Sequence, residues 1–225
     1  MIQTVFLDID NTLVDFNECA KVSAQKAFHD LNLAYHDGVF TTFIEENDKL
    51  WLKIEEGTIT REELHRVRWQ LIFNRLQMDA DGTLMEKLFL KYIEESLVLM
   101  PGALELLSYL ASKYTVCLAS NAPEKQQMKR LANTPILPYV DHVFLSETLG
   151  AAKPEKGFFD ACFRCLPNAS AETSIMIGDS LSADIAGGVS YGMKTCWFNP
   201  HHLPLPTAYN IDYVVHSLAE IQDIL

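Results

Sequence analysis

After the turn signal Met100-Pro101-Gly102, short apolar runs alternate with segments of helical spacing as far as the last residues. Strands are predicted at 115–120, 142–145, 174–178, 194–198 and 213–215, and helices near 103–113, 124–133, 155–166, 182–191 and the C-terminal end. The apolar runs lack polar alternation, as expected for strands that are covered on both faces. Alternating strands and helices indicate a parallel sheet with right-handed crossovers.

One further apolar run, at 3–8, lies far from the others, because the next predicted strand begins only at Thr115. Between them, apolar residues recur at helical spacing over 20–31, 40–54, 60–72 and 83–95, and Thr60-Arg-Glu-Glu63 has the pattern of a capping box. We therefore predict an α/β protein with a doubly wound core made of residues 1–15 and 97–225. A helical domain, residues 16–96, is inserted into this core.

Composition argues against several classes of function. The 225 residues are 48% hydrophobic, enough for a sizeable core, and 30 acidic against 18 basic residues give a formal charge of -12. This charge argues against a nucleic-acid polymer or an anionic membrane as the partner. No apolar run reaches the roughly 18 residues of a membrane span, and no basic and apolar leader opens the sequence. We therefore expect a cytoplasmic protein.

The five cysteines are odd in number, which argues against a disulfide framework. Cys162-x-x-Cys165 lies within an apolar helical pattern, whereas redox pairs usually follow a strand and open a helix. No second cysteine pair is present to complete a zinc site. We therefore interpret this pair as structural.

Polar residues stand at the ends of the predicted strands. The first strand runs into Asp8-Ile-Asp10-Asn-Thr12, and the second ends in Ser120-Asn121. The loop after the third carries Lys153-Pro154, and the fourth ends in Gly178-Asp179-Ser180, with Asp184 five residues beyond Asp179. Ligands of open parallel sheets bind beyond the carboxyl ends of the strands, so these groups are expected at one edge.

Several carboxylates in one pocket repel each other strongly unless cations compensate them. Mg²⁺ prefers oxygen ligands and fits this set, with Asp179 as its anchor. Lys153 would supply further positive charge, and Asp184 could hold either Lys153 or a metal-bound water.

The remaining groups suit phosphoryl chemistry. Thr12, Ser120, Asn121 and Lys153 could hold the phosphoryl oxygens, together with backbone N–H groups after Asp8. Asp8 could attack phosphorus as a carboxylate nucleophile. Asp10 could protonate the leaving oxygen and then activate water.

The four groups resemble, in their order, the four motifs of the haloacid dehalogenase superfamily of hydrolases. The resemblance covers the whole core and implies a Rossmann-like fold, an aspartyl-phosphate intermediate and a mobile helical cap formed by the insert. It also implies Mg²⁺ held by Asp8, the backbone carbonyl of Asp10, and Asp179. The family often has Gly after the second aspartate, where this chain has Asn11, and Asn tolerates unusual backbone angles better than most residues.

A narrower resemblance is to the bacterial pyrimidine 5′-nucleotidases of the same superfamily. It rests on the segments 7–16, 178–188 and 193–200. It implies a small phosphorylated metabolite, a nucleoside monophosphate, as the substrate. Phe16 and Asn17 follow the catalytic loop where the chain enters the insert, so they are candidates for substrate specificity. A hinge or packing role would explain them equally well.

Four other functions stay open. A phosphatase for a sugar phosphate or another small metabolite would need the same core. A carbon–halogen hydrolase needs neither Mg²⁺ nor an acid, so Asp10 and Asp179 argue against it. A phosphomutase would pass the phosphoryl group to a second substrate hydroxyl, and a non-catalytic phosphate-binding protein would need no intact nucleophile. The oligomeric state is left open.

Overall fold

The computed structural model describes all 225 residues, which form two compact units. The α/β unit consists of Met1–Asp15 and Leu99–Leu225, and the helical unit of Phe16–Val98. The chain returns from the helical unit to the α/β unit at Leu99, two residues later than predicted. Leu99 belongs to the α/β unit because it forms an antiparallel bridge with Val14 of the N-terminal segment. The helices are all too short or too polar to cross a membrane.

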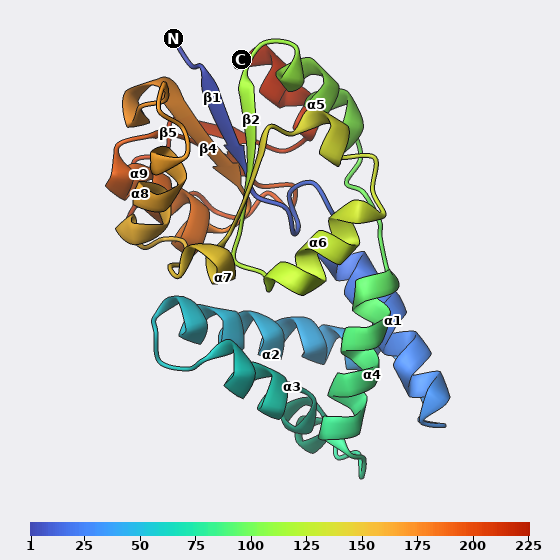
Figure 1. Ribbon diagram of the computed structural model, residues 1–225. Coiled ribbons are helices and arrows are strands. Elements are labelled where there is room, and N and C mark those ends of the chain that lie inside the picture. Colours follow the sequence, from blue (N-terminus) through green and yellow to red (C-terminus); the bar gives the residue numbers. More distant parts are fainter. The chain divides into compact units, whose positions relative to one another are not determined.

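A six-stranded parallel sheet forms the centre of the α/β unit (Figure 1). Its strands are β1 (Thr4–Leu7), β2 (Thr115–Ser120), β3 (His142–Leu145), β4 (Ser174–Gly178), β5 (Lys194–Phe198) and β6 (Tyr213–Val215). The spatial order is β3-β2-β1-β4-β5-β6, and every neighbouring pair is parallel. The predicted α/β class is confirmed. The strand order reverses at β1, which makes the carboxyl end of β1 the expected ligand position.

Helices connect the strands and cover the sheet: α5 (Ala103–Ala111), α6 (Glu124–Ala132), α7 (Ser146–Leu149), α8 (Lys156–Arg164) and α9 (Ala186–Tyr191). Figure 1 shows α8 and α9 on one face of the sheet and α5 on the other. Two predicted helices differ in form. The segment expected as one helix over 182–191 begins with a π-helical turn, Leu181–Ile185, and only then becomes α9. The expected C-terminal helix is a 3₁₀ helix, Leu218–Asp223.

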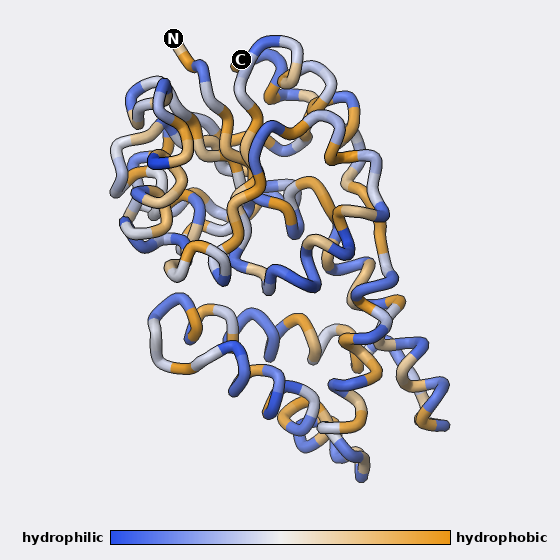
Figure 2. The backbone as a smooth tube through the Cα atoms, viewed as in Figure 1, coloured by the Kyte–Doolittle hydropathy of each residue, from blue (hydrophilic) through white to orange (hydrophobic).

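The core beneath α8 is built from residues in register. Phe6 of β1 pairs with Cys117 of β2 and Met176 of β4, and all three pack in one buried cluster. The strands at the centre of the sheet carry hydrophobic colours in Figure 2. Cys162 of α8 is buried in the same cluster, Cys165 is exposed and all five cysteines are free. Burial raises the pKa of the Cys162 thiol, as expected for a structural residue.

The helical unit contains α1 (Phe16–Asp30), α2 (Asp37–Glu55), α3 (Arg61–Arg75) and α4 (Gly82–Glu95). The predicted capping box at the start of α3 is present, with reciprocal bonds between Thr60 and Glu63. An aromatic core joins the four helices through Phe28, Phe43, Trp69, Phe73 and Phe89.

A buried ion pair lies beside this aromatic core. Arg68 donates to both carboxylate oxygens of Glu86, at 2.6 and 3.2 Å, and to Oδ1 of Asn47 at 2.8 Å. Its guanidinium group also lies 4.8 Å from the ring centre of Phe89. His65 contacts Glu86 from a partly exposed position, at 2.7 Å. Charged groups of this kind are tolerated inside a protein only when fully paired.

Candidate active site

Three predicted site residues meet because their strands are neighbours in register. Leu7, the last residue of β1, pairs with Leu118 of β2 and Ile177 of β4. Asp8 follows β1 directly, and its backbone N–H donates to the carbonyl of Ile177 at 2.9 Å. Ser120 and Asp179 stand at the ends of β2 and β4. The switch point of the sheet therefore collects the polar residues of three strand ends.

Lys153 is the cation at the centre of this site. It is 2% exposed, and its Nζ donates to Oδ1 of Asp8 at 2.6 Å, Oδ1 of Asp184 at 2.7 Å and the carbonyl of Ala119 at 2.6 Å. Three acceptors match the three hydrogens of an ammonium group. Burial lowers the pKa of Lys153, but the two carboxylates outweigh it and the net pKa is raised. Lys153 is therefore a fixed positive charge against Asp8.

Asn121 holds the backbone of Lys153. Its side-chain amide donates to the Lys153 carbonyl at 2.9 Å, and its Oδ1 accepts the Lys153 N–H at 2.9 Å. The sequence assigned Asn121 to the phosphoryl oxygens, whereas this two-point contact gives it a part in positioning the lysine. Ser120 has a related local contact, since its Oγ accepts the N–H of Ala122 at 3.1 Å.

Asp8, Asp179 and Asp184 form an acidic cluster in which one carboxylate oxygen from each lies within 4.8 Å of the others. Burial, opposed by Lys153, raises the pKa of Asp8 to about 7. Burial, followed by the charges of Asp8 and Asp184, raises the pKa of Asp179 well above its ordinary value. Carboxylates that resist ionisation for these reasons fit a hard divalent cation, which would compensate the repulsion.

Asp184 is placed by the π-helical turn. The N–H of Ser180 donates to Oδ2 of Asp184 at 3.1 Å, and Oγ of Ser180 caps the turn by accepting the N–H of Ala183 at 3.1 Å. Gly178 makes room for this carboxylate, because a Cβ there would lie 2.1 Å from Oδ2 of Asp184. Both Asp184 oxygens thus accept hydrogen bonds from the protein. The sequence left Asp184 to hold either Lys153 or a metal-bound water, and its contact with Lys153 favours the first role.

Asp179 is positioned by two neighbours. Its backbone carbonyl accepts a hydrogen bond from Nε1 of Trp197 at 2.9 Å, and Thr12 Oγ1 donates to its Oδ1 at 3.4 Å. Thr12 is fully buried. The sequence placed Thr12 among the phosphate-binding residues, whereas its hydroxyl is directed at Asp179 in this structure. The Trp197 contact was not predicted, since a tryptophan inside an apolar strand is indistinguishable from a core residue.

The loop after Asp8 turns back on itself. The N–H groups of Leu13 and Val14 both donate to the carbonyl of Ile9, at 2.9 and 2.8 Å. Asn11 adopts the left-handed conformation, with φ of 60°. Asparagine is enriched in that region among non-glycine residues, which explains how the loop forms without glycine.

Asp10 contacts two residues that the sequence did not single out. Arg130 donates to its Oδ1 at 2.6 Å and Gln127 to its Oδ2 at 3.0 Å, both from α6. The α6 segment is rich in polar residues, so nothing in the sequence distinguishes these two from their exposed neighbours.

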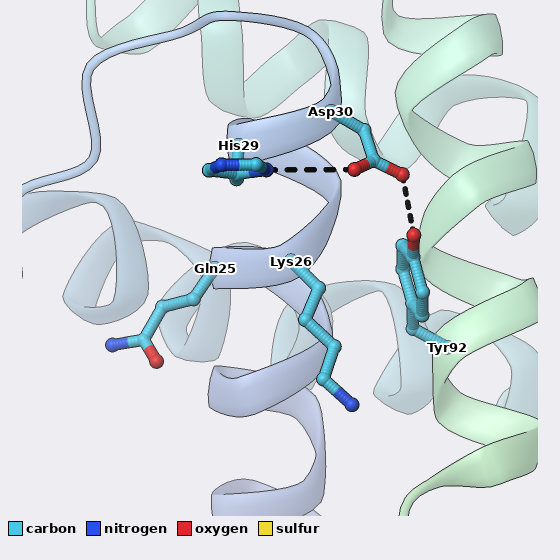
Figure 3. Close-up of a pocket in the computed structure, with 5 residues that line it drawn as sticks. All are labelled: Gln25, Lys26, His29, Asp30 and Tyr92. Atoms are coloured by element: carbon cyan, nitrogen blue, oxygen red, sulfur yellow. Dashed lines mark hydrogen bonds and ion pairs between the residues drawn. The ribbon is translucent and has the colours of Figure 1, made fainter.

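Two predicted candidates and one hollow belong to the helical unit. Phe16 and Asn17 are the first residues of α1. A hollow of about 340 Å³ lies along α1 and α4, lined by Gln25, Lys26, His29, Asp30 and Tyr92 (Figure 3). In Figure 3 the Tyr92 hydroxyl and His29 both contact Asp30. None of the strand-end residues described above lines this hollow.

Comparison with known proteins covers nearly the whole chain. Residues 2–192 match the family described as haloacid dehalogenase-like hydrolase. The crystal structure of the HAD-hydrolase YfnB from Bacillus subtilis, bound to magnesium, superposes with a TM-score of 0.94 at 32% identity, covering 100% of this chain and 98% of that one. The pyrimidine 5′-nucleotidases PynA of Streptococcus pneumoniae and YjjG of Escherichia coli are 31% and 30% identical. Each alignment covers 98% of this chain, with 94% of PynA and 96% of YjjG.

Proposed function

The chain belongs to the haloacid dehalogenase-like hydrolases, and we propose that it is a Mg²⁺-dependent phosphatase that hydrolyses pyrimidine nucleoside 5′-monophosphates through an aspartyl-phosphate on Asp8. The observation that carries this proposal is the buried contact of 2.6 Å between Lys153 and Asp8 at the end of the central strand. It holds a carboxylate nucleophile in a fixed orientation beside a permanent positive charge. Such preorganised charge is the main catalytic device of phosphoryl transfer.

In the first step, an oxygen of Asp8 forms a bond to phosphorus while the bond from phosphorus to the leaving oxygen breaks. Lys153 orients Asp8 and offsets the negative charge of the incoming phosphoryl group. Ser120, and the backbone N–H groups of the loop after Asp8, are the donors proposed for the phosphoryl oxygens. For Asn121 and Thr12 we propose a supporting role, which the contacts of Asn121 with the Lys153 backbone and of Thr12 with Asp179 support.

Asp10 is the proposed general acid and base. It gives a proton to the leaving oxygen in the first step, so the departing nucleoside leaves as an alcohol. In the second step it takes a proton from water as that water attacks phosphorus. The bond between phosphorus and Asp8 then breaks, which releases phosphate and restores the Asp8 carboxylate.

The acidic cluster fits Mg²⁺. The proposed ligands are Asp8, the backbone carbonyl of Asp10, and Asp179, with Asp184 behind them on Lys153. When bound, the ion would neutralise carboxylate and phosphoryl charge at the reacting centre. The relative YfnB has been crystallised with magnesium, which supports this choice of ion.

The nucleotide substrate rests on the relatives PynA and YjjG, which are pyrimidine 5′-nucleotidases. Phe16 and Asn17 follow the loop that contains Asp8 and Asp10, and we retain them as candidates for recognising the leaving group. Stacking of a base on an aromatic ring contributes about 1–3 kcal/mol, enough to separate nucleotides from smaller substrates. Phe16→Ala should then lower kcat/KM for a nucleotide and spare a small aryl phosphate.

The test is a screen of phosphate release with Mg²⁺ over pyrimidine and purine monophosphates, ribose 5-phosphate, other sugar phosphates and an aryl phosphate. We expect the highest kcat/KM for a pyrimidine monophosphate. Asp8→Asn is the matched control, because it keeps the shape of the site and cannot form the acyl phosphate. A preference for sugar phosphates over every nucleotide would overturn the nucleotide assignment and leave the phosphatase assignment standing. If no phosphate were released from any of these compounds, the phosphatase assignment itself would be rejected.

A further inference from the structure

Helix α6 carries two buried polar side chains three residues apart. Gln127 is fully buried and Arg130 is 3% exposed, although the rest of this short helix is rich in exposed polar residues. Side chains at this spacing lie on one side of a helix. Burying a guanidinium group is costly unless it meets a partner, so the partner is informative.

Both side chains converge on one carboxylate. Arg130 donates to Oδ1 of Asp10 at 2.6 Å, and Gln127 donates to Oδ2 of Asp10 at 3.0 Å. Arg130 also donates to Oε1 of Gln127 at 3.0 Å, which ties the two donors together. Each oxygen of Asp10 therefore accepts from a different side chain. Two donors on two oxygens fix the rotation of a carboxyl group as well as its position.

A purely structural tie between α6 and the catalytic loop is the alternative. A buried ion pair contributes little net stability, because desolvation offsets most of the attraction. The contact is also unsymmetrical, since Gln127 and Arg130 are buried whereas the Asp10 side chain keeps 26% of its surface exposed. The Asp10 carboxylate is therefore held by two buried donors while about a quarter of its own side-chain surface stays exposed.

We infer that Gln127 and Arg130 are positioning residues that hold the Asp10 carboxyl group in its working orientation. The inference rests on the proposed role of Asp10 as the acid and base of a phosphatase. Neither α6 residue is required to touch the substrate. Displacement of a reacting group by about 1 Å can cost roughly a hundredfold in rate, so two donors of this kind have a measurable effect.

The experiment is a double-mutant cycle with two substrates, a pyrimidine monophosphate and p-nitrophenyl phosphate. The single variants are Asp10→Asn, Arg130→Met and Gln127→Leu, and the last two are also made in the Asp10→Asn background. Lys125→Met is the matched control, since it removes a charge from an exposed position of the same helix. Circular dichroism and thermal unfolding show which variants fold. Gln127→Leu and the charge-conserving Arg130→Lys provide the measurement if Arg130→Met does not fold.

We expect Arg130→Met to lower kcat/KM for the nucleotide by about tenfold to a hundredfold, part of the 10²–10⁴ that a positioned acid or base contributes. The loss on p-nitrophenyl phosphate should be smaller, because its leaving group needs little protonation. Arg130→Lys should recover part of the loss. In the Asp10→Asn background, either α6 substitution should change kcat/KM less than twofold.

The inference would be overturned if an α6 substitution lowered kcat/KM equally for both substrates and this loss multiplied with the loss caused by Asp10→Asn. The contact would then be a structural tie between α6 and the catalytic loop. That result would not touch the proposed function. If the unmodified chain releases phosphate from neither substrate in the presence of Mg²⁺, the proposed function fails, and the positioning role falls with it.

Discussion

The ammonium group of Lys153 lies 2.7 Å from Oδ1 of Asp184, and both side chains are almost fully buried. Asp184 accepts a second hydrogen bond from the Ser180 N–H, so the carboxylate is itself held in place. The lysine that contacts Asp8 is thus oriented by a residue of the π-helical turn that follows β4. Lys153 therefore links Asp184, in the fourth sequence motif, to the nucleophile Asp8 through one hydrogen bond to each carboxylate.

Asp8→Asn should fold normally and lose turnover almost completely, because an amide cannot form an acyl phosphate. Steady-state rates on a nucleotide and an aryl phosphate measure the loss. Residual activity above about a tenth of the unmodified rate would remove Asp8 from the role of nucleophile, since a tenfold step is only about 1.4 kcal/mol in barrier.

The same substitution should change the pH dependence of stability in excess chelator. Burial raises the pKa of Asp8 from 3.8 to about 7, so the folded state keeps a proton that the unfolded state has lost. The free energy of unfolding therefore falls as pH rises from about 4 to 7. The amide introduced by Asp8→Asn cannot ionise, and the variant should be the more stable protein at pH 8, by about 1–4 kcal/mol.

Thermal unfolding of both proteins from pH 4 to 8 measures this difference. The gap in Tm should shrink towards pH 4, where Asp8 is protonated in the folded protein. A gap that does not change with pH would show that Asp8 titrates normally.

Chelation should abolish phosphate release and added Mg²⁺ should restore it, because the acidic cluster lacks charge compensation without a cation. Asp179→Ala should raise the Mg²⁺ concentration needed for half-maximal activity. Calorimetric titration with Mg²⁺ measures the affinity without turnover. Full phosphate release in excess chelator would contradict the metal requirement.

Gly178→Ala should impair catalysis, because the added Cβ would lie 2.1 Å from Oδ2 of Asp184 and push that carboxylate away from Lys153. We expect a loss of about tenfold or more in kcat/KM and a destabilisation of about 1–3 kcal/mol. Gly157→Ala is the control, since its Cβ would meet only the Ala151 side chain at 3.4 Å. Kinetics of Gly178→Ala equal to those of Gly157→Ala would show that the Asp184 position is unimportant.

Arg68→Met should destabilise the helical unit by about 3 kcal/mol, since it leaves the buried Glu86 carboxylate without its guanidinium partner and with His65 as the remaining side-chain contact. Adding Glu86→Leu should recover part of this loss, because an apolar pair needs no desolvation of charge. Arg66→Met, on an exposed side chain of the same helix, should cost less than about 0.5 kcal/mol. Urea unfolding measures all of these. A loss for Arg68→Met as small as that for Arg66→Met would refute the buried-pair account.

The sequence was sufficient for the fold class and the family, because strand ends and motif order are local patterns. The resemblance to haloacid dehalogenase hydrolases is confirmed by the match over residues 2–192. The sequence was insufficient to predict the partners of Asn121 and Thr12, whose side chains contact Lys153 and Asp179. Side-chain direction depends on the tertiary partner, which a motif does not contain.

The π-helical turn was missed for a similar reason. Its sequence, Leu181-Ser-Ala-Asp-Ile185, has ordinary helical character, and the wider turn is stabilised by Ser180 and by the Asp184 carboxylate bonded to Lys153. Those bonds exist only once the loop that carries Lys153 has packed against β4. A tertiary contact therefore decides a backbone conformation that local propensity leaves as α-helix.

The position of β1 in the sheet has a consequence for folding. This strand is central, yet both its partners, β2 and β4, lie more than a hundred residues away in the chain, as in the pairing of Thr4 with Thr115. The four helices of Phe16–Val98 lie between β1 and β2 in the chain, and they pack through contacts made within that segment. During synthesis the helical unit can collapse early, while β1 remains unpaired until β2 and β4 have been made. The strand that carries the nucleophile into place is made first and becomes ordered late, so acquisition of activity should report completion of the whole sheet.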